Sequence, residues 1–297
     1  MRSVKILGVL MFASQLASAA SATATSVDRH AMADAKGSVE ISNVSGEINV
    51  TGWDKNEVDI KGTLGAAVER LDFLRDGNRI IIKVILPKVS YKSDSSAKLN
   101  IHIPAASKLD VTTVSADITN SGVSGEQRLK SVSGDVATQL AQTDVDIKTV
   151  SGDVRLTGQS SEISTRVNTV SGDISINGGA GNLDISTVSG DLHADMKTVG
   201  SMRMRSTSGD AIVSGRWKAA GRVDFETVSG DLKLSGPADG GMTIDLDSFS
   251  GDISTCFNAP VEKAKYGSSE SLRTKIGGGS VQLRAKTLSG DVSVCDR

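Results

Sequence analysis

The side chains best placed to do chemistry in this chain of 297 residues are carboxylates that recur in one local setting. Each is the aspartate of a Ser-Gly-Asp tripeptide that precedes an apolar residue, and successive copies lie 18 to 21 residues apart. A fixed period of this kind indicates stacked units, which would bring the carboxylates into one file. The aspartates of the unbroken run are Asp135, Asp153, Asp173, Asp191, Asp210, Asp231 and Asp252.

Such a file of like charges needs compensation. Carboxylates about 4.8 Å apart, the spacing of neighbouring strands, repel by about 0.9 kcal/mol per pair even at the dielectric constant of water. Either each aspartate accepts backbone N–H or serine hydroxyl hydrogen bonds in its own Asx-type turn, or the column binds Ca²⁺ between turns. We favour the hydrogen bonds and keep the calcium column as the alternative. The sequence indicates no other metal site, no cofactor and no catalytic residue.

The residues around each tripeptide predict a strand, a corner and a second strand. Val145 and Ile147 alternate with charged residues before one corner, and Val154 and Leu156 alternate around an arginine after it. Such alternation places apolar side chains inside and polar ones outside. Connectors rich in Gly and Asn, such as residues 177–182, have the composition of turns.

These units predict an all-β fold, a single-stranded parallel β-solenoid (β-helix) with turns of about 19 residues. A lone turn would not fold, because its few buried side chains gain about 1.5 to 3 kcal/mol each while ordering costs about 1 to 2 kcal/mol per residue. Stacking supplies the difference. We expect an inward column of hydroxyls to hydrogen-bond along the stack, formed by Thr113, Ser131, Thr149, Thr169, Thr187, Ser206, Thr227, Ser248 and Thr287.

The glycine of each corner is predicted to supply the positive φ that lets two strands meet sharply. Ala116 replaces it once, in Ser-Ala-Asp, and we expect that corner to be the least regular. The corner glycines are Gly134, Gly152, Gly172, Gly190, Gly209, Gly230, Gly251 and Gly290.

The N-terminal part has three predicted sections. Residues 1–19 combine early positive charge, an apolar stretch and a small-residue cleavage site, which predicts a secretory signal peptide. Residues 20–36 lack apolar periodicity and are predicted to be a flexible leader. Residues 37–110 are predicted to hold a first repeat-like unit and a cap on the first turn. The cap contains an antiparallel hairpin that turns at Asp76-Gly77-Asn78.

Residues 111–297 are predicted to form the repeats. The last interval, from Ser250 to Ser289, is 39 residues, so either a turn lacks its motif or residues 256–280 are an inserted excursion. Cys256 and Cys295 each lie six residues after a corner serine. The excursion places them on adjacent turns, within reach of a disulfide, and a missing turn would not. We therefore predict the excursion and the disulfide.

Composition excludes several functions. The net charge is −2, and removal of Arg2 and Lys5 with the signal peptide makes it −4, without a basic block. Nucleic acid is therefore not an expected partner. The histidines His30, His102 and His193 have unrelated local contexts, which argues against a metal site or a Ser/His/Asp arrangement. No later segment is long and apolar enough for a transmembrane span.

The Gly52-Trp53-Asp54 segment, the Val-Ser-Gly-Asp corners and the Gly277-Gly278-Gly279 stretch before the last corner resemble the bacterial putative-adhesin family of β-strand-repeat proteins, a domain-of-unknown-function group. The resemblance covers residues 37–297. It implies a parallel β-solenoid exported to the cell envelope, without a recognised catalytic residue.

We therefore expect a noncatalytic adhesin or scaffold, exported to the periplasm or the cell surface. Its expected partner is an envelope protein or a surface polymer, and self-association is a further option. The alternative is a polysaccharide-acting lyase or hydrolase, which would need acids and basic residues gathered in one groove.

Overall fold

The computed structural model describes residues 24–88 and 94–295, and in them the chain is all-β and β-solenoid-like. The predicted signal peptide lies outside these residues. In the described part of the chain, no helix is long and apolar enough to cross a membrane. The strands are β1 (Thr25–Met32), β2 (Ser38–Trp53), β3 (Glu57–Leu64), β4 (Arg70–Asp76), β5 (Arg79–Ile85), β6 (Ala97–Pro104), β7 (Lys108–Ser121), β8 (Gln127–Lys130), β9 (Val136–Leu140), β10 (Val145–Lys148), β11 (Val154–Asn168), β12 (Ile174–Ser186), β13 (Leu192–Arg205), β14 (Ala211–Ser229), β15 (Leu232–Ser235), β16 (Gly241–Ser250), β17 (Ile253–Thr255), β18 (Glu262–Lys263), β19 (Glu270–Gly277), β20 (Val281–Ser289) and β21 (Val292–Cys295).

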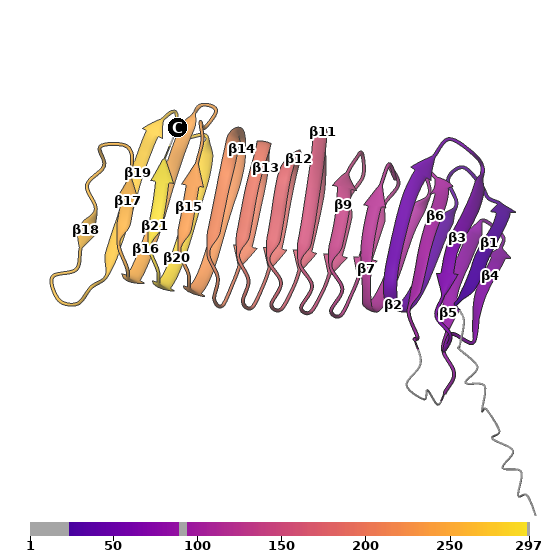
Figure 1. Cartoon of the computed structure of the whole chain (residues 1–297). Coiled ribbons are helices and arrows are strands. Elements are labelled where there is room, and N and C mark those ends of the chain that lie inside the picture. The colour runs from indigo at the N-terminus through magenta and orange to yellow at the C-terminus, as the bar shows by residue number, and fades with distance from the viewer. Residues whose placement is uncertain (1–23, 89–93, 296–297) are drawn as a thin grey trace, which may run out of the picture.

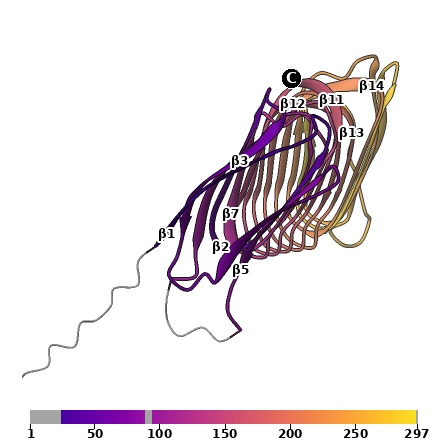
Figure 2. The same cartoon turned by 90° about the vertical axis from the view of Figure 1, so that its right-hand side faces the viewer.

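The middle of the molecule is a stack of similar turns, drawn out lengthwise in Figure 1 and seen as successive loops in Figure 2. Each turn contributes one strand segment before its corner and one after it, and both pair in parallel with the neighbouring turn. In the pairing of β11 with β12, Val154 lies opposite Ile174 and Thr165 lies opposite Leu183. Like positions of successive turns therefore lie in files along the stack.

The core lies between the two strand layers and runs the length of the stack. Ile147 and Ile185 are fully buried before their corners, and Val154 is fully buried after its corner. Trp217 and Phe225 are the largest fully buried side chains. Because each inward side chain packs on the same position above and below, the strand alternation predicted from the sequence determines this core.

The N-terminal end is closed by antiparallel strands. β4 and β5 form the predicted hairpin, with Asp76 opposite Arg79, and β5 pairs with the first half of β2. On the other side, β3 pairs with β6, and β1 pairs with β3 along all eight of its residues. The expectation of a flexible leader is therefore wrong for Thr25–Met32. Only Val27 of β1 is fully buried, so this edge strand carries no apolar alternation to reveal it.

The last turns are not stacked in sequence order. β20 lies between β14 and β16, and β21 lies between β15 and β17, in parallel pairing throughout. The corner at Ser289 therefore sits between those at Ser229 and Ser250, as the order of strands at the C-terminal end of Figure 1 shows. β19 pairs antiparallel with the outer side of β16, and the two-residue strand β18 pairs with β19 beyond it. The order of the last corners along the stack therefore differs from their order in the sequence.

Candidate functional site

The corner glycines are required by the close approach of neighbouring turns. A Cβ placed on Gly152 would fall 2.7 Å from the carbonyl carbon of Gly134 and still closer to its oxygen. The same overlap recurs along the file, each glycine against its neighbour. The predicted positive φ is correct for five corners and wrong for Gly134, Gly152 and Gly172. The five are Gly190, Gly209, Gly230, Gly251 and Gly290.

Ala116 does not mark an irregular corner. It is fully buried within the unbroken strand β7, and it lies opposite Gly46 of β2. At this end of the stack the backbone continues as a strand through the corner position, and the methyl group of Ala116 fits there. The expectation of a local irregularity is therefore wrong.

Six of the nine inward hydroxyls hydrogen-bond within their own corners, whereas those of Thr187 and Thr287 are buried without a hydrogen-bond partner in the described chain. The Oγ1 of Thr149 accepts from the backbone N–H of Gly152 at 3.0 Å, and the Oγ of Ser131 accepts from Gly134 at 2.8 Å. Ser248 is different, because its hydroxyl donates to the carbonyl oxygen of Gly290 in the next turn. The column predicted to bond along the stack is instead a set of local corner braces.

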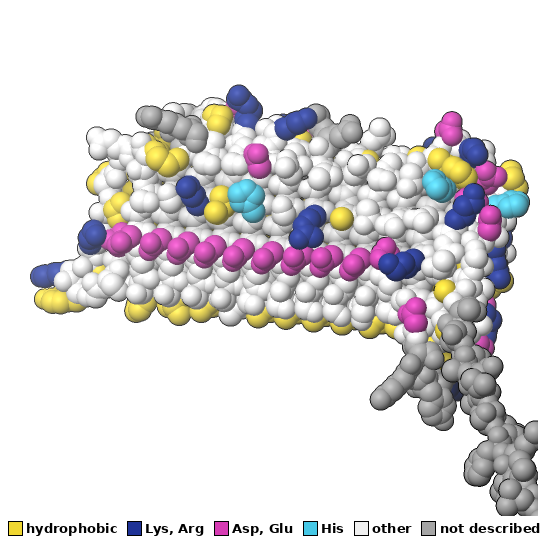
Figure 3. Space-filling view, viewed as in Figure 1, with side chains coloured by type: hydrophobic (Ala, Val, Ile, Leu, Met, Phe, Trp, Pro, Cys, Tyr) yellow, Lys and Arg dark blue, Asp and Glu magenta, His cyan; other side chains and the backbone are white. Residues whose placement is uncertain are grey.

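The carboxylates do form one continuous file, visible as the magenta row in Figure 3. At each step the Oδ1 of one aspartate accepts the backbone N–H of the aspartate in the next turn. Asp135 accepts from Asp153 at 3.0 Å, and Asp153 accepts from Asp173 at 3.1 Å. Asp291 accepts from Asp252 and donates to Asp231, in agreement with the order of the last turns. Hydrogen bonding thus compensates the repulsion, but between turns and not within an Asx turn.

The bonding takes up carboxylate oxygens that a cation would need. Every carboxylate of the column except Asp252, at its end, uses one oxygen to accept a neighbouring N–H. Among the described residues no group of three or more His, Cys, Asp or Glu side chains is arranged to hold a metal ion. A calcium site needs six to eight oxygen ligands around one point. The hydrogen bonds between turns give the Asp135–Asp252 column a structural role, and the calcium column stays a prediction.

An apolar ridge runs beside the acidic file. In nearly every turn the residue before the corner serine is a large hydrophobic side chain that is 44% to 64% exposed. This side chain points outward because side chains alternate along a strand and the preceding threonine or serine points inward. Figure 3 shows hydrophobic side chains in a row along the lower edge of the stack. We call this set the edge ridge: Val114, Val132, Val150, Val170, Val188, Val228, Leu288 and Phe249.

Charges of alternating sign form a second file, on the outer face of the layer that precedes the corners. Arg166 lies between Asp146 and Asp184 in strand register, and its Nε is 3.2 Å from the Oδ2 of Asp184. The alternation continues through the rearranged turns, where Arg284 separates Asp224 from Asp245. We call it the charge ladder: Asp110, Arg128, Asp146, Arg166, Asp184, Arg203, Asp224, Arg284, Asp245 and Arg273.

A shallow groove of about 500 Å³ lies over the central part of this ladder. Its walls include Arg128, Asp146, Arg166, Asp184 and Arg203. This groove was not predicted from the sequence, although aspartates and arginines occupy the same position of successive repeats. Acids there alternate with arginines across strands, so the surface presents both signs of charge to a ligand.

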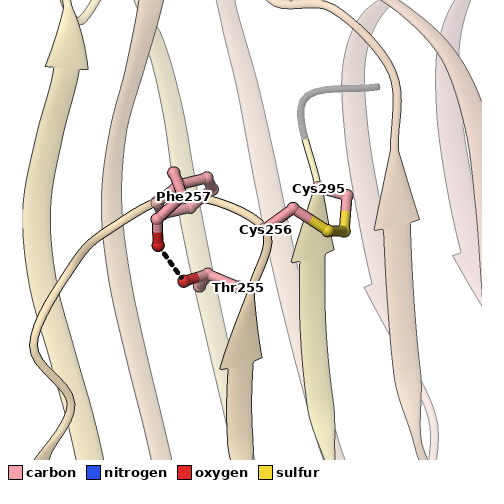
Figure 4. The surroundings of a disulfide bond; sticks show 4 residues. All are labelled: Thr255, Cys256, Phe257 and Cys295. Atoms are coloured by element: carbon pink, nitrogen blue, oxygen red, sulfur yellow. Dashed lines mark hydrogen bonds between the residues drawn. A yellow bond between two sulfur atoms is a disulfide. The ribbon is translucent and has the colours of Figure 1, made fainter.

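The C-terminal turns are fastened covalently. Cys256 and Cys295 form the predicted disulfide, with their Cα atoms 4.9 Å apart on adjacent turns (Figure 4). Nearby, the buried carboxylate of Glu270 accepts the backbone N–H of Ile253 at 2.8 Å and pairs with Lys263 at 2.5 Å. The hydrogen bond from Lys263 and that from Ile253 lower the pKa of Glu270. Glu270 therefore ties the returning strand β19 to the turn that it covers.

Two of the three histidines are closer together than their sequence contexts suggested. His30 and His102 lie on either side of Asp59, in the register of β1, β3 and β6. The Nδ1 of His102 is 3.9 Å from Asp59, and its ring stacks on Trp53 at 5.0 Å. His193 lies far along the chain on β13. The structure thus brings together neither a Ser/His/Asp arrangement nor a metal cluster within its described residues.

Comparison with known proteins supports this architecture. The family model Toastrack DUF4097 matches residues 54–220 and 198–295. A putative adhesin from Parabacteroides distasonis ATCC 8503 is 15% identical, with a TM-score of 0.51 and coverage of 91% of this chain and 97% of that one. A putative adhesin from Bacteroides fragilis NCTC 9343 is 11% identical, with a TM-score of 0.42 and coverage of 91% and 97%.

A putative adhesin from Parabacteroides merdae ATCC 43184 is 12% identical, with a TM-score of 0.41 and coverage of 91% of this chain and 95% of that one. A comparison with curated proteins finds no match. The likeness to the Parabacteroides distasonis protein shows a shared fold, and the family model spans well over half of the sequence. The resemblance drawn from the Ser-Gly-Asp corners is confirmed, and the chain belongs to the Toastrack DUF4097 family.

Proposed function

We propose that this protein is an exported, noncatalytic adhesin or scaffold of the bacterial cell envelope that binds its partner in the groove over the charge ladder. The signal peptide assigned to residues 1–19 would direct export to the periplasm or the cell surface. Residues 37–110 serve as the first unit and its cap. Residues 111–297 form a single-stranded parallel β-solenoid whose excursion, residues 256–280, covers the far end.

The observation that supports this function is the groove itself. It crosses several turns, so a ligand lying in it contacts the same position of each turn at intervals of about 4.8 Å. Arg166 and Asp184 hold each other at 3.2 Å, whereas Arg203 has no ion-pair partner within the described chain. A polymer or protein segment that carries both charge signs fits this surface, and binding at many weak points suits attachment better than turnover.

Binding to envelope material tests the proposal. The full chain should bind cell-envelope extracts, and Arg166→Glu together with Arg203→Glu should reduce binding severalfold. Lys233→Glu is the matched control, because Lys233 is exposed on β15 in the opposite layer and outside the groove. Cell fractionation of the full-length chain tests export. Cytoplasmic retention, or equal binding by the groove variants and the control, would contradict the proposal.

A polysaccharide-acting enzyme is the alternative function, and the groove also supports it. Asp146 and Asp184 share the groove with Arg166, which satisfies the expected gathering of acids and basic residues. Turnover of pectin-like or peptidoglycan substrates, lost in Asp146→Asn and Asp184→Asn, would establish it. Binding of these polymers without turnover would support the adhesin.

A further inference from the structure

We propose that two copies of this chain associate side by side through their edge ridges, in parallel, about a two-fold axis that runs along the stack. The edge ridge places large, half-exposed hydrophobic side chains on eight turns, over a length of about 40 Å. An apolar strip of this size, interrupted at Thr207, on an otherwise polar surface marks a site of protein association. The charges beside the strip indicate which partner packs on it.

The two flanks of the ridge carry opposite charge. On one side, three residues after each ridge side chain, runs the acidic file of the corners. On the other side, two residues before the ridge position, lie exposed cations in four of the turns, one of which carries Thr207 in place of a hydrophobic ridge residue. Lys130, Lys148 and Lys286 make no ion pair within the described part of the chain, and Arg205 pairs only with the exposed Glu226. The ridge thus has an acidic flank and a flank that carries unpaired ammonium groups.

This asymmetry selects one orientation for a second copy. Rotation by 180° about an axis parallel to the stack exchanges the two flanks, so the acidic flank of one copy faces the basic flank of the other. This rotation also places each turn of one copy beside the same turn of the other copy. Rotation that reverses the stack direction leaves the flanks unexchanged and places acid against acid. Charge complementarity therefore favours the parallel pair over the antiparallel pair.

The turns can be matched one by one in the parallel pair. Four turns bring a cation to the aspartate of the other copy: Lys130 to Asp135, Lys148 to Asp153, Arg205 to Asp210 and Lys286 to Asp291. Two turns bring acids together: Glu226 to Asp231 and Asp247 to Asp252. In two others Asn168 and Ser186 offer a hydrogen-bond donor to the opposing carboxylate. The attractive pairs outnumber the repulsive ones, and each aspartate retains an Oδ2 outside the ladder of N–H bonds, although Arg155 of the same chain lies 3.6 Å from the Oδ2 of Asp135 and 3.4 Å from that of Asp153.

Sedimentation of the full chain after signal-peptide removal measures the association. We expect a dimer at concentrations of about 100 μM or below. Val150→Ser with Val170→Ser should weaken the dimer at least tenfold. Ile212→Ser is the matched control, because Ile212 is 42% exposed, as Val150 and Val170 are at 45% and 44%, but lies away from the ridge on β14. A monomer throughout, or equal effects of ridge and control changes, would overturn the proposal.

Charge exchange tests the orientation. Lys148→Glu and Asp153→Lys should each weaken the dimer, and the two together in one chain should restore it, because the opposing pair is then re-formed with reversed signs. Monomer melting, measured below the dissociation constant, controls for folding. A double variant that is weaker than either single variant would contradict the pairing.

Distances between identical positions separate parallel from antiparallel pairs. A spin label at Ser133→Cys, and separately one at Ser250→Cys, should give the same short distance to its equivalent in the other copy. An antiparallel dimer would give a distance at Ser250 that is longer by tens of ångströms, and this result would overturn the parallel arrangement. The test is independent of groove binding, because both positions lie at the corners and not over the charge ladder.

Discussion

Replacing Gly152 with alanine should push two neighbouring turns apart. The new Cβ would lie 2.7 Å from the carbonyl carbon of Gly134 and 3.2 Å from the amide nitrogen of Asp135. Both are backbone atoms, so no side-chain rotation relieves the overlap. Restoring an ordinary contact of 3.4 Å to the carbon needs a local displacement of at least about 0.7 Å, and the carbonyl oxygen of Gly134, which lies closer still, needs more. This displacement would weaken the 2.9 Å hydrogen bond from Ser151 N–H to the carbonyl oxygen of Val132.

The expected loss of unfolding free energy is about 2 to 4 kcal/mol. Overpacking contributes about 1 to 3 kcal/mol and the weakened hydrogen bond about 1 kcal/mol. Gly152 lies outside the left-handed φ region, so steric overlap alone is tested. Urea unfolding followed by circular dichroism measures the change. Ser151→Ala, on the same corner and exposed, should cost less than about 0.5 kcal/mol. If Gly152→Ala were equally mild, the close-approach explanation would be wrong.

Three further perturbations follow from the contacts. Cys256→Ser should lower the stability of the C-terminal turns by about 4 kcal/mol, the loop entropy of a 39-residue closure, and speed amide exchange in β16 and β20; unchanged exchange there would contradict this role. The lowered pKa of Glu270 contributes stability that is present above its unfolded pKa and is lost as the pH falls through the lower folded value. Acid below about pH 4.5 should therefore loosen β19 first, and Glu270→Gln should remove this pH dependence. An acid unfolding profile that is unaltered in Glu270→Gln would contradict this role of Glu270. Asp153→Asn keeps the acceptor for Asp173 N–H and relieves repulsion between carboxylates, so its free energy of unfolding should match or exceed that of the wild type. Asp153→Ala loses that acceptor and should be less stable than the wild type by about 1 kcal/mol. EDTA should not change the melting temperature of the wild type or of either variant, and a lower melting temperature in EDTA would instead support a calcium column.

The repeating part of the fold is predictable because one short motif fixes three requirements at once. The glycine permits close stacking, the aspartate bonds to the next turn, and the preceding Thr-Val pair turns one side chain in and one out. The same alternation would have revealed the edge ridge, since a residue next to an inward threonine must face solvent. The origin of the glycine requirement was not accessible, because it depends on the distance between turns.

The structure at the two ends of the stack could not be predicted from the repeat motif. β1 is held by backbone pairing to β3, and its one fully buried residue, Val27, gives no pattern. One pattern in the sequence does indicate the order of the last turns. In sequence order Asp224 would stand next to Asp245, and placing Arg284 between them restores the alternation that runs from Asp110 to Asp224. Opposite charges on neighbouring strands favour that order, at about 0.2 to 1 kcal/mol per pair.

Disulfide trapping tests the stacking order most directly. In a Cys256→Ser, Cys295→Ser background, Glu226→Cys with Lys286→Cys joins in-register neighbours with the geometry of the native bond. Glu226→Cys with Asp247→Cys places the two cysteines two turns apart, with Cα atoms separated by about 9.6 Å, which is beyond the reach of a disulfide. We predict rapid oxidation of the first pair and none of the second. Oxidation of the second pair instead would show that the turns follow the order of the sequence and would contradict the inserted last turn.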